Sequence, residues 1–67
     1  MERITVNLTT PASQALMRTM DITEENKTDI VNHSILIYAI IREALDRGGE
    51  VYIKPDEKSD LQRVLII

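Results

Sequence analysis

Polar and apolar residues alternate without exception along residues 3–9, which is the pattern of a half-buried β-strand. The apolar face of this strand would carry Ile4, Val6 and Leu8. The opposite, polar face would carry Arg3, Thr5, Asn7 and Thr9. Because a single strand cannot satisfy its own backbone hydrogen-bonding groups, the pattern predicts that this segment pairs with a neighbouring strand.

Helical spacing begins directly after the alternating segment. Thr10 is suited to cap the first free N–H groups of a helix, and Pro11 suits the first helical position, where its missing N–H costs nothing. Apolar residues then recur every three or four positions, which predicts a first helix of roughly ten residues that ends near Asp21.

A second, more apolar helix is predicted after a polar turn at residues 23–27. Thr28 is the expected N-cap, and apolar residues follow on most of the helix circumference from Ile30 to Leu45. The helix is predicted to stop at residues 47–49, where a cation precedes two glycines. A helix this apolar in so small a chain is expected to be covered by a second protomer.

The C-terminal residues have the composition of a β-hairpin. Residues 50–54 and 61–67 are rich in strand-forming residues, and the turn-forming residues 55–60 separate them. The chain is therefore predicted to be α+β, with a first region at 1–49 and a hairpin extension at 50–67.

The length and composition favour an oligomer. The chain has 67 residues, 43% of them hydrophobic, and no cysteine. A single domain of this size buries little apolar surface alone, and without cysteine neither disulfides nor thiolate–metal sites can stabilise it. Association with further copies is the remaining way to enlarge the core.

The charge and the remaining motifs exclude several classes. A net charge of −3 argues against indiscriminate binding to nucleic acid or anionic membranes. We expect a cytoplasmic protein, because no signal-peptide pattern is present and the apolar run at residues 35–41 is too short to span a bilayer. His33 is the only histidine, so no metal site is expected. No nucleophile–base pair is recognisable, so we expect that the chain is not an enzyme and binds no cofactor.

The stretches "RITVNLTTP" at 3–11 and "NKTDIVNHSI" at 26–35 resemble the ribbon-helix-helix (Arc/MetJ-like) family of DNA-binding proteins. The resemblance covers roughly residues 3–47 and rests on the order of the elements. It implies a homodimer in which the N-terminal strands of two copies form an intermolecular antiparallel ribbon. Such a ribbon fits the major groove of double-stranded DNA, so the implied function is transcriptional regulation, as a repressor.

The resemblance also implies roles for individual residues. The base-contacting residues would be Arg3, Thr5 and Asn7, which carry donors and acceptors suited to base edges. The phosphate-contacting residues would be Lys27 and Thr28, at the start of the second helix. The dimer core would be formed by Ile4, Val6, Leu8, Ile30, Val31, Ile35, Tyr38, Ile41 and Leu45.

Two other functions and one other fold are compatible with the same residues. An antitoxin of this fold would use the C-terminal segment to hold a protein partner. A protein-interaction module, such as a small phage protein that sequesters a host factor, would bind no DNA. Alternatively, residues 3–9 would pair with the hairpin of their own chain and give a β-α-α-β-β protomer.

Overall fold

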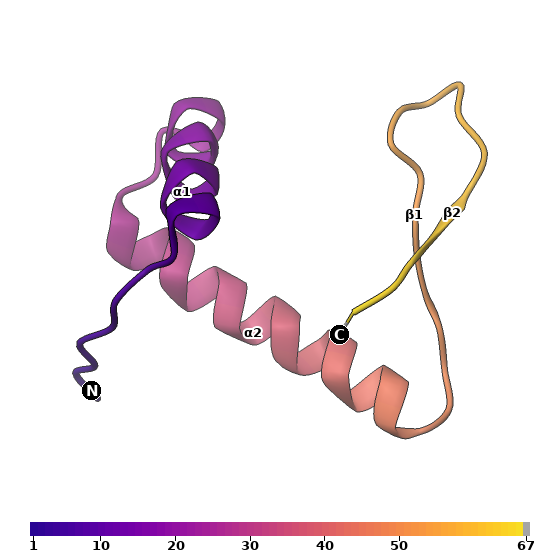
Figure 1. The fold of residues 1–67 in the computed structure, drawn as a ribbon, viewed down its shortest axis with the longest axis horizontal. Helices are drawn as coiled ribbons and strands as arrows, with labels where there is room; N and C mark the ends of the chain where they lie inside the picture. Colours follow the sequence, from indigo (N-terminus) through magenta and orange to yellow (C-terminus); the bar gives the residue numbers. More distant parts are fainter. Residues whose placement is uncertain (67) are drawn as a thin grey trace. The chain divides into compact units, whose positions relative to one another are not determined.

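The protein is α+β, as predicted: two helices are followed by a two-stranded antiparallel sheet (Figure 1). The computed structural model describes residues 1–66. The elements are α1 (Thr10–Thr23), α2 (Lys27–Asp46), β1 (Val51–Ile53) and β2 (Gln62–Val64). The chain divides into two compact units, Met1–His33 and a second that begins at Ser34, so the boundary lies within α2.

Helix α1 begins at Thr10, the residue predicted to be its cap, so the observed cap lies one residue earlier than predicted. Thr9 is the N-cap, with φ −65° and ψ 160°, and its hydroxyl accepts a hydrogen bond from the Ala12 N–H at 3.3 Å. Thr10 is therefore the first helical residue, and its prediction as the cap is wrong. The reason is that both threonines offer the same hydroxyl, and only Thr9 has the extended backbone that a cap requires.

The end of α1 is set by a residue other than glycine. Glu24 adopts the left-handed conformation, with φ 60°, and its N–H donates to the Met20 carbonyl at 2.8 Å. This single bond is the αL form of helix termination, which usually places glycine or asparagine at this position. The helix consequently extends past the predicted end near Asp21 to Thr23.

Helix α2 is capped by Asn26 and not by Thr28, so this prediction is also wrong. The Asn26 Oδ1 accepts from the Asp29 N–H at 2.8 Å, which is the spacing of an N-cap to the third helical residue. Thr28 already lies inside the helix, and its carbonyl accepts from the Asn32 amide at 2.7 Å. An asparagine three residues before Asp29 was the sequence signal for this cap.

The predicted C-terminal stop of α2 is confirmed. Gly48 has φ 81°, and its N–H donates to the Leu45 carbonyl at 3.0 Å. The Gly49 N–H donates to the Ala44 carbonyl at 2.9 Å, which completes a Schellman motif. A Cβ atom on Gly49 would lie 2.8 Å from the same carbonyl oxygen, so both glycines are required by the backbone.

Substitution of Asn26 or Thr28 by alanine shows which of the two side chains caps α2. An Asn26→Ala variant is expected to lose about 1 kcal/mol of unfolding free energy, because the Asp29 N–H loses its acceptor. A Thr28→Ala variant should change this free energy by less than about half as much, since alanine is the better helix former inside a helix. Urea denaturation followed by circular dichroism measures both values. Equal losses in the two variants would contradict the assignment of the cap.

Residues 3–9 form no strand in the described chain, although alternation predicted one. The sheet contains β1 and β2 alone within residues 1–66, so the N-terminal segment does not pair with the hairpin. The β-α-α-β-β protomer is therefore not observed. A strand exists only where a neighbour accepts and donates its backbone hydrogen bonds, and the single chain supplies none to this segment.

The C-terminal hairpin is confirmed, with shorter strands than predicted. Val51 pairs with Val64, and Ile53 pairs with Gln62. The predicted second strand ended at Ile67, which lies outside the described residues. On one face of the ladder, the Glu50 Oε2 lies 3.1 Å from the Arg63 Nε.

The turn of the hairpin is closed by Asp56. Its Oδ1 accepts from the Ser59 hydroxyl at 2.8 Å and from the Lys58 N–H at 2.9 Å. The Ser59 hydroxyl first, and then the Lys58 N–H, lower the pKa of Asp56 below its ordinary value of 3.8. A lowered pKa means that this stabilisation is present above that ordinary value and is lost as the pH falls through the pKa of the folded state.

Almost no side chain is buried in the single chain. Ile30 is the one buried residue within residues 1–66, at 7% exposure. Leu16 and Met20 of α1 belong to the same unit and are half-buried. Neither of the two described helices combines the length and hydrophobicity of a membrane span.

Candidate nucleic-acid interface

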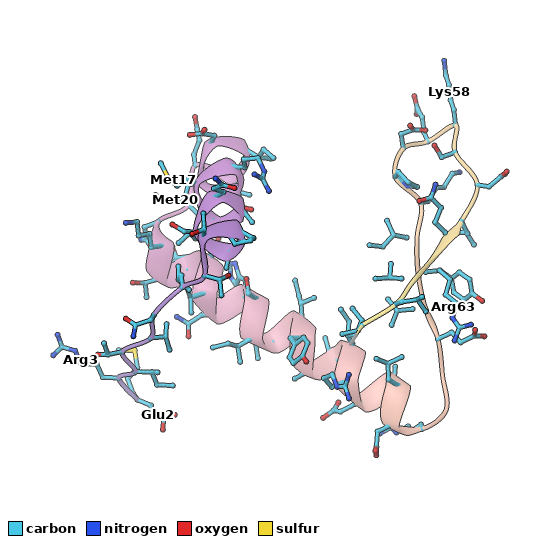
Figure 2. All side chains as sticks on the ribbon, viewed as in Figure 1. Glu2, Arg3, Met17, Met20, Lys58 and Arg63 are labelled. Carbon is cyan, nitrogen blue, oxygen red and sulfur yellow. The ribbon has the colours of Figure 1, made fainter. Side chains whose placement is uncertain are left out.

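The N-terminal segment presents its polar side chains to solvent. Arg3, Thr5 and Asn7 are all exposed, and within residues 1–66 none of them forms a side-chain hydrogen bond or an ion pair. Figure 2 shows the Arg3 side chain directed away from the chain and from the neighbouring Glu2. The three predicted base-contacting groups therefore keep their full hydrogen-bonding capacity for an outside partner.

The apolar face of the same segment is exposed as well. Ile4 is 65% and Val6 60% exposed, and Leu8 is the least exposed of the three. Isolated apolar residues on a surface are normal, but three in alternating positions form an apolar stripe. Contact of this stripe with water is unfavourable in free energy. Both faces of the segment thus lack the neighbours that the alternation predicts.

The start of α2 offers two backbone N–H groups that are free in the described chain, those of Lys27 and Thr28, beside the basic side chain of Lys27. The Asn26 cap takes up the Asp29 N–H, while the N–H groups of Lys27 and Thr28 precede the first intrahelical hydrogen bond, which Ile30 donates to the Asn26 carbonyl at 3.2 Å. Both side chains are exposed. This arrangement suits an anionic oxygen.

Acidic side chains reduce the positive potential of this unit. Its cations are Arg3, Arg18 and Lys27, whereas its acids are Glu2, Asp21, Glu24, Glu25 and Asp29. One acid is directed elsewhere: the Glu25 Oε2 lies 3.0 Å from the His33 Nδ1. The surface therefore suits a few specific contacts rather than strong non-specific attraction to DNA.

The predicted dimer core is largely open in the single chain. On α2, Val31, Ile35 and Tyr38 are exposed, with Ile35 at 56%, and Ile41 and Leu45 are half-buried. Ile30 differs from the others because it is already buried. A second stripe on the same helix is also exposed and consists of Leu36, Ile37 and Ile40.

The structure adds two features that the sequence interpretation missed. One is the Asn26 cap, which orients the N–H groups beside Lys27. The other is the contact of Glu25 with His33, which a separation of eight residues across a turn does not signal. No protein-family model matches the chain, and no curated protein or solved structure matches it.

Proposed function

We propose that the protein is a homodimeric ribbon-helix-helix regulator that reads DNA with its paired N-terminal segments. The observation that carries this proposal is the exposed, alternating segment at residues 3–9, directly ahead of two capped helices. In this arrangement the apolar stripe turns inward against the dimer core, and the polar stripe of both copies faces the major groove. DNA occupancy by the dimer then represses transcription.

The exposed apolar surface supports self-association. On the N-terminal segment, Ile4 is 65% and Val6 60% exposed, and on α2 Ile35 is 56% exposed. Apolar side chains that gather on one exposed face mark protein-interaction surfaces, and a second copy of the chain would cover these residues.

The three outward residues have complementary chemistry for base recognition. Arg3 can donate two hydrogen bonds to guanine, and Asn7 can both donate to and accept from adenine. Thr5 can bond a base edge or touch a thymine methyl group. Two-fold symmetry doubles each contact and so predicts an operator of symmetric or repeated half-sites.

Selection of bound sequences from a random DNA pool tests this proposal. At moderate salt, the dimer is expected to enrich a motif with two-fold symmetry. Failure to enrich any sequence, together with no retention of DNA at low salt, would contradict the proposal. That outcome would favour the protein-interaction function, which requires no DNA.

The phosphate contact makes a separate prediction. A Lys27→Ala variant should bind operator and non-operator DNA more weakly by similar factors. Because a dimer carries two copies, the slope of log K against log salt should fall in magnitude by about 2. Fluorescence anisotropy across a salt series measures the slope.

Lys58 provides the matched control. This lysine projects from the tip of the hairpin and belongs to the other unit of the chain, so a Lys58→Ala variant removes the same charge from a residue that is not assigned to the interface (Figure 2). Its salt slope should match that of the parent chain. Equal slopes for both variants would mean that Lys27 contributes only to the net charge.

A further inference from the structure

The outer edge of β1 has no partner strand in the described chain. The sheet has the order β1-β2, so one edge of each strand remains open within residues 1–66. An open edge presents unpaired N–H and C=O groups, and a two-stranded hairpin alone is marginally stable in water. Tyr52 and Ile53 on β1 are also exposed, at 49% and 52%.

The residues along β1 are complementary to the same residues read in the opposite direction. The order Glu50, Val51, Tyr52, Ile53, Lys54 reads acid, aliphatic, aromatic, aliphatic, base. An antiparallel pairing of two such strands about Tyr52 places Glu50 opposite Lys54 twice. It also places Val51 opposite Ile53 twice, and Tyr52 opposite its own copy. Opposite charges and aromatic pairs in facing positions both stabilise an antiparallel ladder.

We propose that β1 pairs antiparallel with β1 of a second copy of this chain, which gives a four-stranded sheet in the order β2-β1-β1-β2. This pairing keeps side chains on their own faces, because Val51 and Ile53 exchange places across the two-fold axis. The half-buried residues Val51 and Val64 then lie on one continuous apolar face with their copies. The proposal concerns the hairpin and does not depend on DNA binding.

The edge of β2 is less suited to the same pairing. Symmetry about Arg63 would place two guanidinium groups opposite each other, and symmetry about Val64 would place Arg63 opposite Leu65. Neither register creates an opposite-charge pair. Charge complementarity therefore selects β1 as the pairing edge.

Cysteine crosslinking tests the register, because the chain contains no cysteine of its own. A Tyr52→Cys variant places two thiols opposite each other at the symmetry axis, within reach of a disulfide. It is expected to form an intermolecular disulfide at least about tenfold faster than a Gln62→Cys variant, which carries its thiol on β2. Equal rates at the two positions would overturn the proposal.

Charge reversal tests the facing of Glu50 and Lys54 across the two copies, and a mixture of the two variants controls for the loss of the Glu50–Arg63 contact within one hairpin. In the Tyr52→Cys background, Lys54→Glu makes two like-charge pairs, and Glu50→Lys makes two others. Each variant should crosslink with itself about tenfold more slowly than the Tyr52→Cys parent. When the two variants are unfolded, mixed and refolded together, both opposite-charge pairs return, and the mixed disulfide should predominate. A random distribution of disulfides would overturn the proposal, and because residues 1–33 are unchanged, that result would leave the DNA proposal standing.

Discussion

An Ile35→Glu chain is expected to lose the proposed dimer and most of its folded structure. Ile35 lies in the proposed dimer core and is 56% exposed in the single chain. Removing a buried isoleucine costs about 2–5 kcal/mol, and the dimer contains two copies. Burial of two glutamates that lack partners adds to this cost. The total approaches the roughly 5–15 kcal/mol by which proteins are usually stable.

Ile40→Glu is the matched control for this prediction. It makes the same chemical change on α2, but Ile40 lies on the second stripe, outside the proposed dimer core, and is 67% exposed. Sedimentation equilibrium and urea denaturation should show a large loss of dimer and stability for Ile35→Glu and a small one for Ile40→Glu. Equal effects, or the reverse order, would show that a different face of α2 is covered.

An Arg3→Ala, Asn7→Ala double variant is expected to lose sequence discrimination while it stays folded and dimeric. Each good bidentate base contact contributes about 1–3 kcal/mol of discrimination, and the proposed dimer would make each contact twice. Preference for the selected operator over other DNA should therefore fall by at least about a hundredfold. Competition binding measures the ratio of affinities.

A double variant on the hairpin, Gln62→Ala with Arg63→Ala, serves as its control. It also removes an amide and a guanidinium, and both lie on β2 outside the proposed interface. Its preference for the operator should equal that of the parent. If the Arg3 and Asn7 variant keeps the parent's preference, these residues do not read bases.

The sequence predicted best those features that neighbouring residues determine. The α2 stop was correct because Gly48 and Gly49 make hydrogen bonds to carbonyls only a turn away. The hairpin was also correct, since its turn is closed by Asp56 through local hydrogen bonds. The caps were less reliable: Thr9, Thr10, Asn26 and Thr28 all have capping side chains, and the backbone conformation selects among them.

The predicted N-terminal strand shows that neither the sequence nor a single chain identifies the partner of a strand. Alternation identifies which face of residues 3–9 is apolar, and the structure leaves both faces exposed. Backbone pairing depends on a partner, and no other segment within residues 1–66 supplies one. The same holds for the candidate interface, because the proposed DNA-reading surface exists only when two copies combine their polar stripes.

Crosslinking of a Thr5→Cys chain tests the pairing of two N-terminal segments most directly. A ribbon centred on Thr5 would place the two thiols opposite each other, and no native cysteine competes. We predict a symmetric disulfide that forms at least about tenfold faster than in a Gln14→Cys chain, whose thiol lies on the exposed surface of α1. If Thr5→Cys forms a disulfide no faster than Gln14→Cys, no ribbon exists and the proposed DNA-reading surface is lost with it.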